Sequence, residues 1–441
     1  MIQEIRLDVL DITLDYYYRT KDKPKYLNKL IDCISILYIE RYGSKSYTKS
    51  VDSIVSILYN IVKSIKYESD GLFISRDRNF YNTDVIVNGS VLQCNVGYTG
   101  IINTLDLLEL LGMLVVSKGY SYDDRSQSGY VLFTPELIDM VESNVDMNKV
   151  SRTPRNNVLI VKDINGTPIC FRKTKEIRIM IDLLKDYNNF MSKREVYCKD
   201  KKLNTDLHRS FSRGSFEFGG RFYSEAYGVQ QLTKRLRKEI IIDGEETIEL
   251  DFKALHPSII YASKGIELDE DFDVYGGTQA MFDLCYELDT NYINNRNLIE
   301  RYQPVRNILK LCMLVMLNAK SRHTAIYTIK QEIEKDNALP LEDRRFYGVY
   351  GLTVEDCVKY LTKHNTLIKD HFFSDAGIKL QNMDSNIIAC VMEECIHKNI
   401  PALFVHDSVV CPLSNLGEGL LIMKSAFKRV VGNELNCRIE V

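Results

Sequence analysis

The sequence lacks several features that would place it in a particular class of protein. No apolar run reaches 18 residues, which argues against a membrane-spanning helix. The first residues, MIQEIRLDVLD, do not have the pattern of a signal peptide. The 11 cysteines are odd in number and include no Cys-x-x-Cys pair, so we expect reduced core residues rather than a zinc site or a disulfide framework. These absences predict a soluble, cytoplasmic protein.

The sequence also lacks a strong net charge, internal repeats and low-complexity segments. Its formal charge is −3, which does not by itself indicate a nucleic-acid-binding protein. However, residues 151–240 contain 20 Lys and Arg against 10 Asp and Glu, about +10, which leaves about −13 for the rest of the chain. A local basic segment of this kind can bind phosphates, although a solvated charged surface accounts for the same composition equally well.

The 441 residues are too many for one ordinary core, and 45% apolar with 27% charged residues is typical of a globular protein. We predict a helical region over residues 1–68, a second domain over 69–150, a basic connecting region over 151–215 and a main domain over 216–441.

Residues 69–150 have a distinctive order of elements. The sequence predicts a helix over Asn103–Leu111, strands over Met113–Lys118 and Gly129–Phe133, and a further helix from Pro135. This order resembles a winged helix-turn-helix, whose wing would carry Lys118 and Arg125 near DNA phosphates. Winged helices also bind proteins, so DNA and a replication protein are alternative partners of residues 1–150.

Two aspartates carry the strongest chemical signal. In Ile248–Tyr261, IELDFKALHPSIIY, the pattern predicts a half-buried strand that ends at Asp251 and is followed by an apolar helix. In Ala402–Pro412, ALFVHDSVVCP, two apolar runs predict a hairpin with Asp407 at its turn. A buried carboxylate is costly unless it is paired or holds a metal. Brought together, these two aspartates would form a two-metal site for phosphoryl transfer.

A third stretch, Gln303–Ser321, predicts a helix that begins near Pro304. Residues at a spacing of four form one slowly turning stripe on this helix: Arg306, Lys310, Leu314 and Asn318. Since the other residues are mostly apolar and need burial, the polar stripe is narrow. Facing the aspartates, its cations could hold a triphosphate; the alternative is a solvated helix face.

Three arginines are candidates for contact with a nucleic-acid backbone: Arg209, Arg213 and Arg221. Gly219 and Gly220 interrupt an aromatic, strand-like run and allow close approach of another backbone. Beside them, Arg221 could pair a phosphate through two hydrogen bonds.

The segment Phe216–Val441 resembles the right-hand polymerases of the family-A DNA polymerase and single-subunit RNA polymerase superfamily. The resemblance depends on motifs that occur in the right order with sensible spacing. Glu217–Arg221 is similar to the template-contacting DxxGR motif, and Asp251 stands where motif A has its metal ligand. Arg306 and Lys310 match the fingers helix, and Val405–Ser408 is similar to motif C, with Asp407 as second ligand. Leu380–Val391 looks like the helix that precedes motif C.

The resemblance implies an α+β fold, with an antiparallel palm, helical fingers and a thumb-like region over residues 151–215. It implies template-directed nucleotidyl transfer with two Mg²⁺ ions, or Mn²⁺ as a substitute, on a nucleic-acid template and primer with nucleoside triphosphates. Arg306 and Lys310 would bind the triphosphate, and Lys310 would also neutralise or protonate the leaving pyrophosphate. The chain would then be a small DNA polymerase without a proofreading exonuclease, similar to those of mobile elements or phages.

Three positions depart from, or vary within, the superfamily pattern. Asn318-Ala319 stands where family-A polymerases have Tyr-Gly, and Ser408 follows Asp407 as in the RNA polymerases. His256 lies five residues after Asp251, where DNA polymerases have a bulky residue that blocks the ribose 2′ hydroxyl. Asn318 could instead donate a hydrogen bond to a ribose hydroxyl.

We predict DNA synthesis, with His256 as the sugar gate, the side chain that blocks the ribose 2′ hydroxyl. The steric effect should outweigh the hydrogen bond from Asn318, because one hydrogen bond contributes only about 1 kcal/mol. A primase or single-subunit RNA polymerase is the alternative. A non-catalytic DNA-binding initiator or defence protein, with a degenerate palm, is an alternative of another class.

Overall fold

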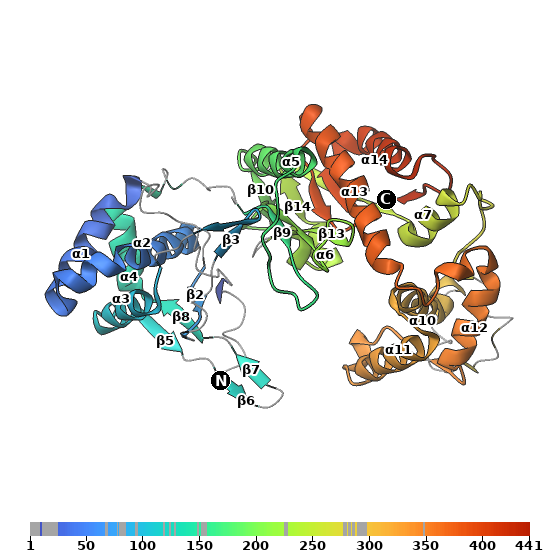
Figure 1. The fold of residues 1–441 in the computed structure, drawn as a ribbon, viewed down its shortest axis with the longest axis horizontal. Coiled ribbons are helices and arrows are strands. Elements are labelled where there is room, and N and C mark those ends of the chain that lie inside the picture. Colours follow the sequence, from blue (N-terminus) through green and yellow to red (C-terminus); the bar gives the residue numbers. More distant parts are fainter. Residues whose placement is uncertain are drawn as a thin grey trace.

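The computed structural model mixes helices and sheets in two lobes, each with its own hydrophobic core (Figure 1). It describes residues 9–10, 25–66, 69–76, 78, 85–92, 96–117, 120–122, 125–127, 129–147, 150, 157–224, 228–276, 280, 284, 287–288, 298–346 and 349–441. One core contains buried residues between Leu27 and Val150, and the other between Val158 and Phe427. The predicted mixture of helix and sheet is confirmed. Within these ranges, no helix has the length and apolar character needed to cross a membrane.

The N-terminal lobe combines helices with a sheet in the strand order β1-β2-β8-β5. Its helices are α1 (Asn28–Tyr42), α2 (Ser44–Lys66), α3 (Tyr98–Leu110) and α4 (Pro135–Asn144). Its strands are β1 (Val9–Leu10), β2 (Gly71–Ile74), β3 (Val85–Val87), β4 (Ser90–Leu92), β5 (Leu114–Ser117), β6 (Tyr120–Tyr122), β7 (Arg125–Gln127) and β8 (Gly129–Phe133). Thr134 caps α4 by accepting a hydrogen bond from the Leu137 N–H, and Pro135 suits the first helical position.

The helix, strand, strand and helix predicted in this lobe are present as α3, β5, β8 and α4. Between β5 and β8, strands β6 and β7 pair with each other. Lys118 and the side chain of Arg125 lie outside the described residues. The winged-helix assignment and its contact with DNA or a replication protein stay predictions.

The C-terminal lobe is built on a sheet in the order β11-β10-β14-β15-β19-β18, with β20 paired to β15. A second sheet has the order β13-β12-β9. The strands are β9 (Leu159–Val161), β10 (Val196–Cys198), β11 (Lys201–Lys202), β12 (Leu207–Phe211), β13 (Gly219–Ser224), β14 (Ile240–Ile242), β15 (Glu245–Phe252), β18 (Leu403–Val405), β19 (Ser408–Pro412) and β20 (Ile439–Glu440). A separate pair joins β16 (Glu287–Leu288) and β17 (Val349–Tyr350). The predicted strand at Asp251 and hairpin at Asp407 are therefore confirmed.

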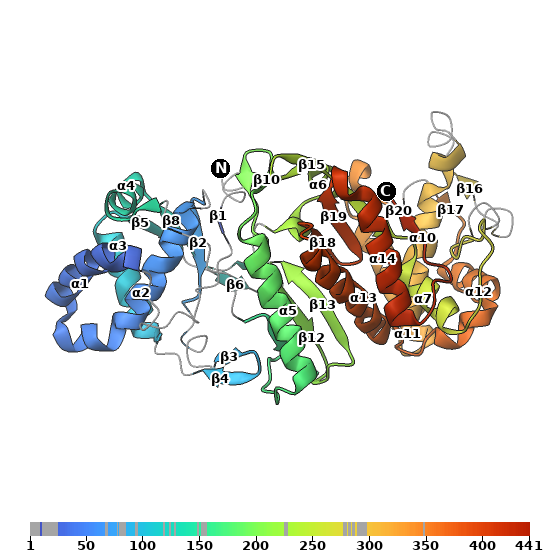
Figure 2. The same ribbon diagram turned by 90° about the horizontal axis from the view of Figure 1, so that it is seen from above.

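Helices cover the sheets and extend beyond them. Helices α5 (Lys175–Met191), α13 (Gly377–His397) and α14 (Leu416–Val431) pack on β12, β13 and β19, respectively (Figure 2). The short helix α6 (Lys234–Arg237) precedes β14, and α7 (Leu255–Ser263) follows β15. Helices α10 (Leu298–Asn318), α11 (Arg322–Asn337) and α12 (Val354–His364) pack together at the end of the lobe (Figure 1).

The structure places two features of this lobe that the sequence predicted, the thumb-like region and the start of the fingers helix. Strands β10 and β11, within the predicted thumb-like region 151–215, pair into the main sheet, and α5 contributes to the same core. That segment is therefore part of the C-terminal core, and its thumb-like role stays a prediction. Pro304 does not begin its helix, because α10 already starts at Leu298 and contains the proline.

Candidate functional site

The pairing of β15 with β19 brings Asp251 and Asp407 together. Asp251 is the register partner of Ser408, the residue directly after Asp407. The Ser408 hydroxyl donates a hydrogen bond of 2.8 Å to Asp251 Oδ1. His406 has a φ of 56°, the left-handed conformation that lets a two-residue hairpin close, and Asp407 follows it in the turn. The predicted pair of carboxylates is thus assembled by one strand end and one hairpin turn.

The electrostatics of this pair are unfavourable without a cation. Burial, together with the negative charge of Asp251, raises the pKa of Asp407 to about 6. Burial also raises the pKa of Asp251, which the hydrogen bond from Ser408 opposes. The pair thus offers hard oxygen ligands at a place where positive charge is favoured.

A magnesium ion fits this set of donors. Among the residues that the structure describes, no group of three or more His, Cys, Asp or Glu side chains is arranged to hold a metal. Mg²⁺ commonly uses one or two carboxylates and completes its shell with water and substrate phosphates. Two aspartates are therefore sufficient protein ligands for a cation that is shared with a phosphate substrate.

The predicted cations of α10 lie around a tyrosine that the sequence analysis missed. The Arg306 guanidinium carbon is 5.0 Å, and the Lys310 ammonium nitrogen 5.7 Å, from the centre of the Tyr275 ring. Arg306 Nε also pairs with Asp273 Oδ2 at 3.1 Å. Asp273 and Tyr275 belong to an acidic, aromatic segment after α7 that has no periodic pattern, so no sequence signal singled them out.

The charges on both sides of the site influence each other. Desolvation and the neighbouring Arg306 charge lower the pKa of Lys310, while Glu440, Asp273 and Asp251 act in the opposite direction. Burial raises the pKa of Tyr275 to about 12, and Asp407 is among the charges that act on its hydroxyl. The α10 stripe is therefore close enough to the carboxylates to be coupled to them.

Glu440 is a further carboxylate near Asp251 that the sequence did not indicate. It is the register partner of Asp251 across the β15–β20 pairing. Its side chain pairs with Lys253, with 3.3 Å between Nζ and Oε1.

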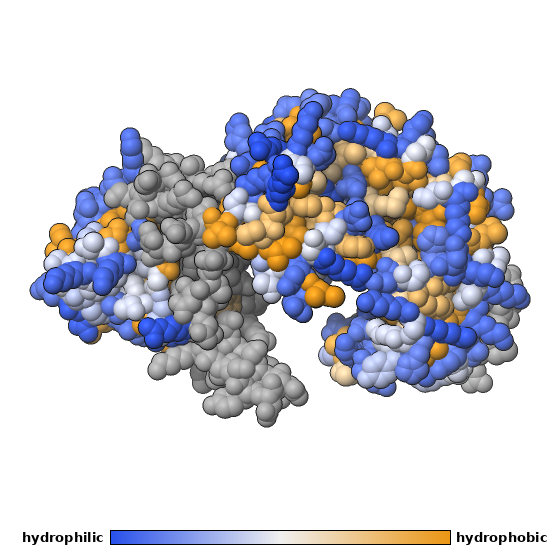
Figure 3. All heavy atoms as spheres, viewed as in Figure 1, coloured by the Kyte–Doolittle hydropathy of each residue, from blue (hydrophilic) through white to orange (hydrophobic). Residues whose placement is uncertain are grey.

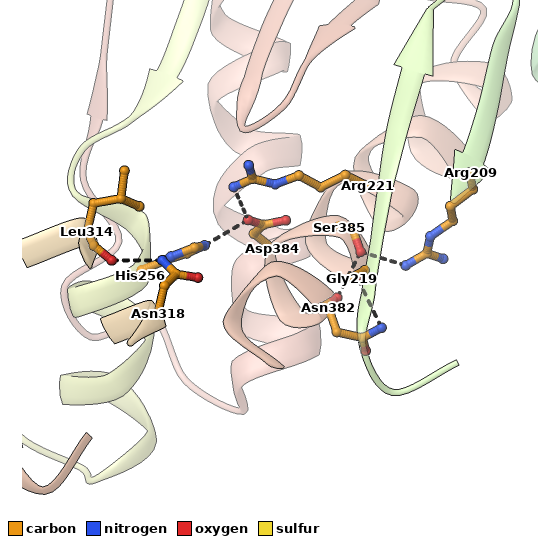
Figure 4. A network of polar contacts seen from close by, with 9 residues as sticks. All are labelled: Arg209, Gly219, Arg221, His256, Leu314, Asn318, Asn382, Asp384 and Ser385. Atoms are coloured by element: carbon orange, nitrogen blue, oxygen red, sulfur yellow. Dashed lines mark hydrogen bonds and ion pairs between the residues drawn. The ribbon is translucent and has the colours of Figure 1, made fainter. Parts of the chain in front are cut away.

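Figure 4 shows where the structure places Arg221, His256 and Asn318. Arg221 Nη2 and His256 Nε2 each lie 2.8 Å from Oδ2 of Asp384, a residue of α13 that is 2% exposed. Asn318 Nδ2 donates to the Leu314 carbonyl at 2.7 Å, within the α10 stripe. Asp384 lies inside the predicted helix Leu380–Val391, but no spacing pattern indicated its role.

The prediction that Arg209 contacts phosphate is wrong. Arg209 is 3% exposed, and its guanidinium lies between the rings of Phe211 and Phe222. Its Nε donates to the Gly220 carbonyl, and its Nη2 donates to Ser385 and Asn386 of α13. These donors hold β12, β13 and α13 together, so they are not available to a nucleic acid.

Arg213 is more exposed but is also paired. Its two terminal nitrogens donate to the two carboxylate oxygens of Asp375, at 2.6 and 2.9 Å. Contact of Arg213 and Arg221 with a nucleic-acid backbone stays a prediction.

Comparison with known proteins adds little to this geometry. No protein-family model matches the chain. No curated protein matches it either. Among solved structures, one match is described as the POL domain of Pol1 from M. smegmatis in complex with DNA primer-template and dNTP. It is 13% identical with a TM-score of 0.29, and the match covers 60% of this chain and 51% of that one. The match therefore spans about half of that structure's chain, at a similarity too low to support an argument.

The raised pKa of Asp407 predicts how the stability of the metal-free protein depends on pH. Folding raises this pKa from 3.8 to about 6, so the folded state holds the proton more tightly and loses stability as the pH rises through that window. Asp407→Asn removes the cost of ionisation. With a chelator present, we expect the variant to be more stable than the wild type at pH 7.5, by about 1–3 kcal/mol, and to lose this advantage near pH 4.

Urea unfolding at both pH values measures this difference. Asp182→Asn, at an exposed position of α5, is the control and should shift stability little at either pH. An equal effect of Asp407→Asn at both pH values would show that the aspartate carries no such penalty.

Proposed function

We propose that the chain is a metal-dependent nucleotidyltransferase that copies a nucleic-acid template, and that its product is DNA. The observation that carries this proposal is that the β15–β19 pairing brings the carboxylates of Asp251 and Asp407 together, and that Asp251 acts on the pKa of Lys310 in the α10 stripe. A site with acidic metal ligands on one side and cations on the other suits a triphosphate and its leaving pyrophosphate. The motif order described above supports the same conclusion.

Each side of the site would have its own task. Asp251 and Asp407 would hold up to two divalent cations, which lower the pKa of an attacking hydroxyl and neutralise phosphate charge when bound. Arg306, oriented by Asp273 through Nε, would bind the phosphates. Lys310 would also bind the phosphates, and its lowered pKa would help it to donate a proton to the leaving pyrophosphate.

The shape of the surface is compatible with a long ligand. On the face drawn in Figure 3, the surface of the C-terminal lobe is hollowed between the part that contains the sheets and the helices α10–α12. Residues of helices α10–α12 on this face are largely hydrophilic.

The non-catalytic alternative is less well supported by the site. A DNA-binding initiator or defence protein would have no use for two adjacent buried carboxylates whose ionised forms destabilise the fold. A primase or RNA polymerase would use the same carboxylates. It differs from a DNA polymerase in its choice of sugar, for which His256 is our candidate gate.

The direct test is incorporation of labelled nucleotides on primed and unprimed templates with Mg²⁺. Asp251→Asn and Asp407→Asn should each lower the rate at least tenfold, a loss of about 1.4 kcal/mol or more in transition-state stabilisation, because each removes a ligand charge. Asp182→Asn should retain the wild-type rate. Either active-site variant at more than a tenth of the wild-type rate would exclude that aspartate as a metal ligand.

The roles of the two α10 cations can be separated by steady-state kinetics. Arg306→Ala should mainly raise the KM for the nucleotide, since Arg306 would contact the phosphates before and during the reaction. Lys310→Ala should lower kcat as well, because its charge matters most as pyrophosphate leaves. Lys359→Ala, on the exposed surface of α12, is the control. Wild-type kinetics in both test variants would mean that the stripe serves only the fold.

A further inference from the structure

We propose that Asp384 is a positioning residue that holds His256 and Arg221 in fixed places and thereby determines how strictly the site selects its sugar. This inference rests on the proposed function. Asp384 comes from α13, His256 from α7 and Arg221 from β13, so one carboxylate joins three elements that are distant in the sequence (Figure 4).

The contacts make this carboxylate a shared anchor. Both donors reach the same oxygen, Oδ2, at 2.8 Å, and the Asp384 side chain is 2% exposed. The His256 and Arg221 side chains are 11% and 25% exposed, so both are largely buried where they contact this carboxylate. A buried charge with two donors is a costly and specific arrangement, because removing the carboxylate leaves both donors without their acceptor.

Hydrogen bonds made by its neighbours on α13 fix the position of Asp384. Arg209 donates to Ser385 and Asn386, the two residues that follow Asp384. Asn382 donates to the carbonyls of Phe216 and Gly219, just before Arg221. Asp384 therefore has little freedom to move relative to the segment that carries Arg221.

The consequence for His256 concerns both its tautomer and its mobility. His256 Nε2 lies 2.8 Å from Asp384 Oδ2, and we assign the proton to Nε2, because a carboxylate oxygen accepts and this tautomer lets the ring donate to it. This bond fixes the plane of the imidazole, and Pro257 restricts the backbone of His256. A steric gate rejects a 2′ hydroxyl only if the side chain cannot move aside. The bond to Asp384 would supply that rigidity.

The network also reaches the carboxylate pair. The negative charge of Asp384 contributes to the raised pKa of Asp407, whereas the positive charge of Arg221 lowers it.

The test compares deoxy- and ribonucleotides through the ratio of their kcat/KM values. In Asp384→Asn, which keeps the size of the side chain, this ratio should fall about tenfold towards that of His256→Ala. The double variant should lose no more than His256→Ala alone, because both changes remove the same gate. Asp336→Asn is the matched control: Asp336 is a buried carboxylate of α11 that pairs with Arg345, and its variant should lose stability without a change in the ratio.

A second pair of variants keeps the inference testable if Asp384→Asn does not fold. His256→Gln retains a donor that can reach Asp384, whereas His256→Leu retains bulk without a donor. We expect His256→Gln to keep most of the discrimination and His256→Leu to lose most of it. If His256→Leu discriminates between the two sugars as well as His256→Gln does, bulk alone forms the gate and the role of Asp384 is overturned.

A spectroscopic readout separates this inference from the proposed function. Nitrogen NMR of His256 should report the Nε2–H tautomer in the wild type and a changed signal in Asp384→Asn. If the wild type incorporates no nucleotide, the proposed function fails while this signal still tests the contact. If the wild type is active but its sugar ratio does not change in Asp384→Asn, the inference about Asp384 fails alone.

Discussion

The C-terminal lobe is organised around two carboxylates that are held side by side against their mutual repulsion. The pairing of β15 with β19 imposes this arrangement, because it sets Asp251 opposite Ser408 and next to Asp407. The register itself is fixed by apolar neighbours that are almost fully buried, Leu250, Val409 and Val410. A slip of one residue would turn Asp251 to the other face of the sheet and expose this core. Hydrophobic burial thus keeps in place a pair of charges that would otherwise separate.

A buried polar network holds the elements around this pair. Arg209 is deeply buried, and desolvation lowers its pKa to about 10 although the charge of Asp384 acts in the opposite direction. Its guanidinium connects β12 and β13 to α13, and α13 presents Asp384 to His256 and Arg221. The arginine that first seemed suited to phosphate binding therefore serves the fold. Through α13 it also sets the positions of residues nearer the site.

The sequence predicted the parts of the site that depend on local pattern. Asp251 and Asp407 each follow an alternating or apolar run that ends at a turn, and such runs are typical of strands. Arg306 and Lys310 share a helix face, which their spacing alone determines. By contrast, contacts between elements that are distant in the sequence set the positions of Asp384, Tyr275 and Glu440. The periodicity of apolar residues along the sequence does not reveal such contacts. The prediction that Arg209 contacts phosphate failed for the same reason, because the alternation of residues in β12 does not reveal which neighbours enclose the Arg209 side chain.

Asp251 and Asp407 are proposed to bind a divalent cation together, and binding of Mn²⁺ measured by electron paramagnetic resonance tests this most directly. Free Mn²⁺ gives a strong signal that is broadened on binding, so titration of the protein at pH 7.5 yields a dissociation constant without any catalytic step. We expect saturable binding by the wild type and by Asp182→Asn, and binding at least tenfold weaker in Asp251→Asn and in Asp407→Asn. Equal affinity in all four proteins would contradict it.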